Sequence, residues 1–82
     1  MNPLVSFNRI LGWVYVGIGI AVLAGWALTQ SGIVLQIGLV LAAVGGLHLL
    51  AARAFAREHP WRWVAQAAPP ALLLVQLLLA AR

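Results

Sequence analysis

The chain has 82 residues, of which 65% are hydrophobic and 7% charged, and its five arginines and single glutamate give a formal net charge of +4. A soluble domain carries about 25% charged residues, and a chain this short buries only ~60% of its unfolded surface, so this composition is typical of a protein that lies in lipid. It also excludes a disordered chain, which is polar or highly charged, and the absence of cysteine excludes disulfide scaffolds, thiolate metal sites and iron–sulfur clusters.

Two apolar runs in the first two thirds of the chain have the length of membrane-spanning helices. They cover residues 10–29 and 33–52, and neither contains an arginine or a glutamate. About 20 helical residues, rising 1.5 Å each, cross ~30 Å of hydrocarbon. Only Gln30, Ser31 and Gly32 separate the two runs. The sequence therefore predicts two spans joined as a tight antiparallel hairpin.

The third apolar run, residues 64–81, predicts a span over about residues 62–81 and contains Pro69 and Pro70. Each proline removes a backbone donor and disfavours helix in the residue before it. One interpretation is a kinked third span over the whole run. The alternative is an interfacial segment over residues 60–68, followed by a helix that starts at Pro70 and is too short to cross alone. We favour the kinked span, which makes residues 1–82 a single all-α transmembrane domain with three helices.

The arginines set the expected orientation. Arg9 precedes the first span, and Arg53, Arg57 and Arg62 lie in the second loop. Three crossings place all four on the same side, which the positive-inside rule assigns to the cytoplasm. Arginine without lysine, together with abundant alanine and leucine, fits a bacterium with a GC-rich genome. We therefore expect a bacterial inner membrane protein with its N-terminus in the cytoplasm and its C-terminus in the periplasm.

Small residues recur every four positions in each of the first two spans. The two stripes consist of Gly17, Ala21 and Gly25 in the first span and of Gly38, Ala42 and Gly46 in the second. Stripes of this kind let two helix backbones approach closely. We expect the two stripes to face each other within the hairpin, with docking of one stripe onto a helix of another protein as the alternative.

The first span has a second structured face, about 180° from its small-residue stripe at about 100° per residue. This face consists of Gly12, Tyr15, Gly19, Val22 and Trp26. A span with two structured faces is expected to make contacts on both sides. We therefore expect the second face to meet the third span, another copy of the chain or a larger partner.

Gln36 lies inside the second apolar run, and Gln76 lies in the leucine-rich part of the third. A buried amide in hydrocarbon is costly unless it is hydrogen-bonded. If the two side chains pair, the third span packs on the back of the second. If they do not, each meets a neighbouring subunit or a lipid headgroup.

His48 is the candidate cofactor ligand of the chain. Gly45 and Gly46 lie beside it, which leaves room for a flat macrocycle such as haem or chlorophyll, and haem iron needs an axial ligand of this kind. No second histidine inside the spans offers a bis-histidine pair. We nevertheless favour a structural role, in which His48 bonds to a neighbour such as Tyr15 or to interfacial water, and keep the cofactor as the alternative.

The residues that catalysis and coupled transport need do not occur inside the spans. The only acidic residue, Glu58, lies in the second loop, which argues against proton- or cation-coupled carriers. The sequence also has no carboxylate pair, no serine with a histidine and aspartate, no phosphate-binding glycine loop and no metal-ligand cluster. It therefore predicts neither an enzyme nor a metal site.

The second loop is both basic and aromatic. Its arginines and tryptophans are Arg53, Arg57, Trp61, Arg62 and Trp63. Basic residues beside a span attract anionic headgroups, and tryptophan is enriched at the membrane interface. We expect this loop to anchor on lipid, with docking onto an acidic surface of a partner as the alternative. Nucleic acid is not an expected partner, since the positive-inside rule already explains the arginines.

These observations predict a non-catalytic accessory or structural subunit that packs against a larger integral membrane complex of a respiratory, photosynthetic or transport system. One alternative is a homo-oligomeric small membrane pore or carrier, lined by Gln36, Gln76 or Thr29. A second alternative is a haem- or chlorophyll-binding subunit that uses His48.

Overall fold

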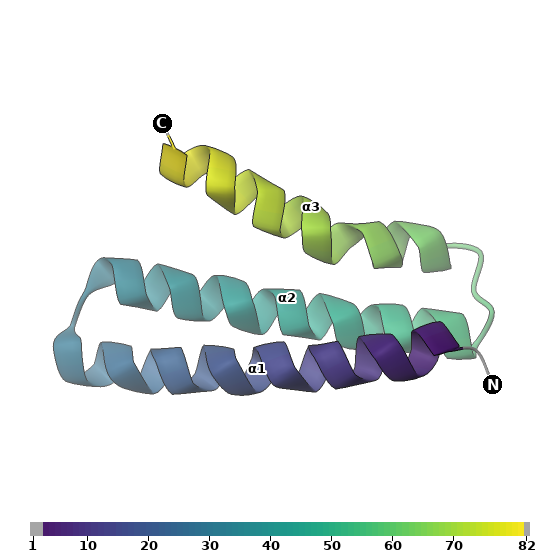
Figure 1. Ribbon diagram of the computed structural model, residues 1–82, viewed down its shortest axis with the longest axis horizontal. Coiled ribbons are helices and arrows are strands. Elements are labelled where there is room, and N and C mark those ends of the chain that lie inside the picture. The colour runs from purple at the N-terminus through teal and green to yellow at the C-terminus, as the bar shows by residue number, and fades with distance from the viewer. Residues whose placement is uncertain (1–2, 82) are drawn as a thin grey trace.

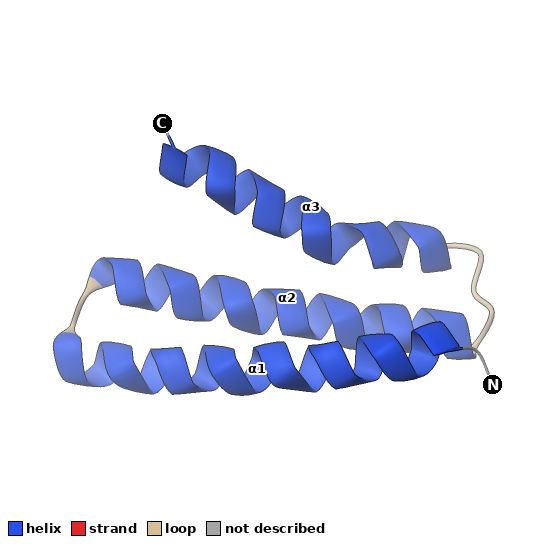
Figure 2. Ribbon diagram, in the orientation of Figure 1, coloured by secondary structure: helices blue, strands red, loops and turns tan. Residues whose placement is uncertain are grey.

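The computed structural model describes residues 3–81, which form three α-helices (Figure 1). Helix α1 spans Pro3–Thr29, α2 spans Gly32–Ala56 and α3 spans Arg62–Ala81. Short connections join them, and no strand occurs in the described residues (Figure 2). Each helix is long and apolar enough to cross a membrane. The chain is therefore all-α with three candidate transmembrane helices, which suggests a membrane location.

The three helices lie side by side, with α2 in the middle (Figure 1). Within residues 3–81, α1 and α3 each pack on α2 and not on each other. The molecule measures 43 × 27 × 14 Å, which is the shape of a slab. A slab of helices buries few side chains, and the buried apolar side chains of the described residues are Val5, Val44, Ala51, Ala52, Phe55 and Pro69.

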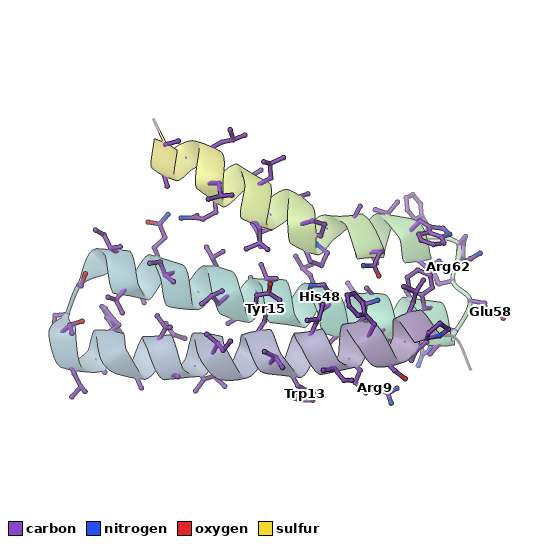
Figure 3. All side chains as sticks on the ribbon, in the orientation of Figure 1. Arg9, Trp13, Tyr15, His48, Glu58 and Arg62 are labelled. Carbon is purple, nitrogen blue, oxygen red and sulfur yellow. The ribbon has the colours of Figure 1, made fainter. Side chains whose placement is uncertain are left out.

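The ends of the helices fall into two groups at opposite ends of the slab. The start of α1 lies at the same end as the connection between α2 and α3, whereas the connection between α1 and α2 lies at the end where α3 finishes (Figure 1). Arg9, Glu58 and Arg62 lie toward the first of these ends (Figure 3). The polar and charged residues of the second loop and the start of α1 are therefore gathered at one end of the molecule.

Gln30 and Ser31 form the connection between α1 and α2. Gln30 has a φ of 58°, the left-handed conformation that commonly ends a helix. Its Nε2 donates to the backbone oxygen of Ala27 at 3.1 Å, and Thr29 Oγ1 donates to that of Gly25 at 3.0 Å. The bond from Gln30 satisfies the Ala27 carbonyl, one of those that the last turn of a helix leaves without a helical partner.

Helix α3 continues through both prolines. Pro69 is almost fully buried, whereas Pro70 is exposed. The helix starts beside α2 and diverges from it toward the C-terminal end (Figure 1). Residues 62–68 therefore belong to the same helix as the leucine-rich segment after the prolines.

A pair of glycines on each helix lies in the contact between α1 and α2. A Cβ atom added to Gly19 would lie 2.6 Å from the backbone nitrogen of Ala42, and one added to Gly45 would lie 2.6 Å from that of Val16. The same test places a Cβ of Gly12 2.6 Å from Leu49 Cγ and a Cβ of Gly38 2.8 Å from Leu23 Cγ. At Gly19 and Gly45 the backbones approach so closely that only glycine fits, and at Gly12 and Gly38 a larger residue would displace a leucine side chain of the other helix.

This contact differs from the predicted one on the α1 side. A Cβ atom at Gly17 or Gly25 would meet nothing within 4 Å, and Ala21 is exposed. The stripe expected inside the hairpin thus faces outward, and the prediction for this face of α1 was wrong. On α2, Gly38 and Ala42 lie in the contact as expected, but Gly46 faces open space.

The second face of α1, which the sequence assigned to a partner, contributes to the hairpin instead. Gly12 and Gly19 of this face are seven residues apart, as are Gly38 and Gly45 on α2. Positions seven apart drift only about 20° around a straight helix, whereas every four-residue step drifts about 40° at 100° per residue. The seven-residue glycine pairs therefore stay on one line along the contact. Tyr15 and Trp26 of the same face are half-buried.

Candidate functional site

A buried polar cluster joins all three helices. His48 of α2 is 6% exposed, and Asn8 of α1 is 0% exposed. His48 Nδ1 lies 2.9 Å from Asn8 Oδ1. Asn8 Nδ2 donates to Gln66 Oε1 of α3 at 2.6 Å and to the backbone oxygen of Leu4 at 2.8 Å. Asn8 therefore links α1 to α3, although the two helices pack only on α2.

Asn8 and Gln66 are the functional residues that the sequence reasoning missed. Asn8 precedes the predicted first span, which starts at residue 10, so it is not among the polar residues expected inside the spans. The structure begins α1 at Pro3, so Asn8 lies within the helix and has the intrahelical spacing for its bond to Leu4. The sequence feature that could have identified Asn8 and Gln66 is a polar residue that flanks an apolar run at helical spacing.

The cluster fixes the proton position on His48. Both hydrogens of Asn8 Nδ2 are donated, to Gln66 and to Leu4, and its Oδ1 accepts only. His48 Nδ1 must therefore donate to Asn8 Oδ1, which in a neutral imidazole leaves Nε2 unprotonated. This tautomer, assigned from the hydrogen-bond network, orients the ring and leaves one nitrogen lone pair unused.

Tyr15 covers the His48 ring. The two ring centroids are 5.6 Å apart and the ring planes are inclined by 8°, so the rings stack (Figure 3). His48 therefore bonds to Asn8 and stacks on Tyr15, where the sequence suggested a hydrogen bond to Tyr15. No hydrogen bond to His48 Nε2 comes from residues 3–81, and no fully buried side-chain nitrogen or oxygen in this range lacks a partner. The free nitrogen thus keeps access to the surface of the chain.

The surroundings of His48 set what it can bind. Gly45 packs against Val16, and of the two neighbouring glycines only Gly46 faces open space. Tyr15 occupies one side of the ring. In the described part of the chain, no three histidine, cysteine or acidic residues come together as a metal site. Nε2 can accept a hydrogen bond or supply one axial ligand to a group that approaches from outside the chain.

A second polar contact joins α2 to α3. Gln36 Nε2 donates to Gln76 Oε1 at 3.3 Å. The sequence linked this pairing to a third span on the back of the second, and α3 does pack on the side of α2 away from α1 (Figure 1). Because Gln36 is exposed and Gln76 half-buried, this contact lies nearer the surface than the Asn8 cluster.

His59 orders the connection between α2 and α3. Its Nδ1 accepts a hydrogen bond from the backbone nitrogen of Trp61 at 3.1 Å, and its backbone oxygen accepts one from Arg62 Nη1 at 3.0 Å. Trp63 packs edge-on against Phe55, with ring centroids 5.1 Å apart. Trp61 and Trp63 remain largely exposed, as do the arginines Arg53 and Arg57. The predicted interfacial residues therefore lie together on the outside of this end of the slab.

Comparison of the chain with known protein families, curated proteins and solved structures finds no match. The function of the protein is therefore argued from its own residues.

Proposed function

We propose that the protein is a non-catalytic accessory subunit that packs against a larger integral membrane complex. The observation that carries this proposal is the outward direction of the small-residue stripe on α1. A Cβ atom at Gly17 or Gly25 would meet nothing within 4 Å, and Ala21 between them is exposed. The stripe lies about 180° around the helix from Gly12 and Gly19, at about 100° per residue.

An exposed stripe of small residues allows another helix to pack closely against α1, and lipid gains less from it. Lipid tails are as apolar as leucine, so helices associate in membranes mainly through close packing and interhelical hydrogen bonds. Trp13 and Ile18 are larger exposed side chains of the same helix, and the stripe itself carries no side chain larger than a methyl group. Because α1 is an outer helix of the slab, a partner helix can reach this stripe without displacing α2 or α3.

The connections support contacts within the membrane rather than outside it. Two residues join α1 to α2, and residues 57–61 join α2 to α3. Neither connection is long enough to form a domain of its own. We therefore expect a partner protein to contact residues 3–81 mainly along the helices.

Co-purification from native membranes tests this proposal. The doubly substituted variant Gly17→Leu/Ala21→Leu places two large side chains on the stripe and should lose the partner proteins that the unaltered chain retains in mild detergent. Gly46→Leu is the matched control, since it places the same side chain in open space on α2, and it should keep them. A chain that purifies without other proteins, or a double variant that retains them, would contradict the proposal. A symmetric particle made of this chain alone would favour a homo-oligomeric pore or carrier.

One observation favours a second candidate function, a haem- or chlorophyll-binding subunit. The hydrogen bond to Asn8 gives His48 the tautomer whose Nε2 can ligate a metal. A visible absorption band in the protein purified from its own membranes, lost in His48→Ala and kept in His59→Ala, is the expected result. Purified protein without any visible band would exclude this candidate.

A further inference from the structure

Two cavities lie next to each other around the C-terminal half of α2. The first, of about 400 Å³, is lined in part by Arg57, His59 and Trp61, and the second, of about 490 Å³, in part by Arg9 and Trp13. Leu50 and Arg53 line both cavities. Arg53 therefore stands between two sites, each of which has a second arginine of its own.

The charge in these cavities is uncompensated. No carboxylate lines either of them. The guanidinium groups of Arg9, Arg53 and Arg57 make no hydrogen bond or ion pair with any residue from 3 to 81. Glu58, the only acidic residue of the chain, is exposed in the neighbouring connection. The cavities thus present three free cations to an incoming ligand.

The rest of each cavity wall is apolar. Leu49, Leu50 and alanines of α2 line the walls, with Trp61 in one cavity and Trp13 in the other. A ligand that fits both features has anionic groups beside long apolar chains. Arginine binds phosphate through two parallel hydrogen bonds, and basic pockets between membrane helices bind anionic headgroups. Tryptophan in turn is typical of the depth at which headgroups lie.

We propose that the two cavities form one binding site for a phospholipid with two phosphate groups. Arg53 lies between the phosphates, Arg57 holds one and Arg9 holds the other, and the acyl chains lie along Leu49 and Leu50. A single ligand with two phosphates can occupy both cavities because the cavities share a wall, formed by Leu50 and Arg53. Once one phosphate is held, the second binds intramolecularly at high effective concentration. Two separate single-phosphate lipids would lack this gain.

The test compares lipids at equal phosphate concentration by native mass spectrometry of the purified full chain in detergent. Cardiolipin, the two-phosphate probe, should bind as a single adduct at least about tenfold more tightly than phosphatidylglycerol. Phosphatidylcholine should bind more weakly than both. Equal binding of cardiolipin and phosphatidylglycerol would overturn the proposal of one two-phosphate ligand. Equal binding of all three lipids would overturn an anionic site altogether.

Arginine variants locate the site. Arg53→Gln should weaken cardiolipin binding by about tenfold or more, since it removes a contact to both phosphates. Arg9→Gln and Arg57→Gln should each leave an affinity for cardiolipin close to that for phosphatidylglycerol. Arg62→Gln is the control of equal charge change, because Arg62 lines neither cavity and its Nη1 is bonded to His59. If Arg62→Gln weakened binding as much as Arg53→Gln, the attraction would be due to net charge and the site would be refuted. Circular dichroism of each variant shows that the helices are retained.

Discussion

The side chain of Asn8 makes the hydrogen bond that connects the two outer helices, α1 and α3. It is fully buried, and its side chain is bonded to groups of α1, α2 and α3. A buried amide in an apolar environment is costly unless its groups are paired. Here every polar group of the amide has a partner, so the cluster stabilises one register of α1 and α3 against α2.

Replacement of Asn8 by alanine should therefore destabilise the fold. The change leaves His48 Nδ1 and Gln66 Oε1 without their partner, and an unpaired buried polar group costs about 1–3 kcal/mol. Denaturation of the purified protein in detergent micelles, followed by circular dichroism, measures the loss. Gln36→Ala is the control, since the Gln36–Gln76 bond is longer, at 3.3 Å, and exposed. If Gln36→Ala lowered the free energy of unfolding as much as Asn8→Ala, the buried cluster would stabilise the fold no more than the exposed Gln36–Gln76 bond does.

The residue scale also shows what the sequence can predict about the site. His48 stands out because it is a histidine inside an apolar run, and the Gln36–Gln76 pair stands out for the same reason. Asn8 lies before the first apolar run and Gln66 lies near the start of the third, so neither interrupts the most apolar stretch of a span. Their pairing depends on the lateral arrangement of three helices, which a single sequence does not state.

At the scale of elements, two glycine pairs seven residues apart set the contact between α1 and α2. The sequence shows two small-residue faces on α1, and both are able to pack. The choice between them depends on which glycines line up across an antiparallel pair, where Gly12 meets Gly45 and Gly19 meets Gly38. The stripe of Gly17, Ala21 and Gly25 repeats every four residues, but it lies on the face of α1 that points away from α2.

Single alanine substitutions distinguish the two faces of α1. Gly19→Ala places a Cβ atom 2.6 Å from the backbone of Ala42, which cannot move unless the helices separate, and overpacking of this kind costs about 1–3 kcal/mol. Gly17→Ala meets open space and should leave stability unchanged or raise it by up to about 1 kcal/mol through helix propensity. Thermal unfolding in detergent measures both. The reverse order of the two effects would show that the predicted stripe forms the hairpin after all.

The turn between α1 and α2 offers a stabilising substitution. Gln30 has a φ of 58°, and a left-handed conformation costs a non-glycine residue roughly 1–2 kcal/mol. Gln30→Gly removes this strain and loses the side-chain bond to Ala27, so we expect a net gain of up to about 1 kcal/mol in unfolding free energy. Thr29→Gly, one position earlier inside the helix, should lower it. A loss of stability in Gln30→Gly would contradict the strained turn.

The helices themselves follow closely from hydropathy. The predicted third span has the bounds of α3, and the second differs from α2 by one residue at its start. Helix α1 begins seven residues before the predicted span and α2 ends four residues after its own. Hydropathy identifies only the apolar part of a helix, the part that would lie in lipid. The backbone continues as a helix through polar residues until a turn ends it.

At the scale of the whole molecule, the flat arrangement explains why so few side chains are buried. A layer with α2 in the middle gives α1 and α3 a single neighbour each, and large apolar side chains such as Ile10, Leu28 and Leu77 stay exposed. In water such a surface would drive aggregation. In a bilayer the lipid covers it, and the charged residues among residues 3–81 lie toward one end of the slab.

Labelling of single cysteines tests the central claim, that the chain crosses the membrane three times. The chain contains no cysteine, so Ser31→Cys, Glu58→Cys and Ala81→Cys each introduce one thiol, at the two connections and at the end of α3. A membrane-impermeant thiol reagent, applied to intact cells and then to inverted membranes, reports the side of each position. The account predicts that positions 31 and 81 react from one side and position 58 from the other. Reaction of positions 58 and 81 from the same side would show that α3 does not cross, and would contradict it.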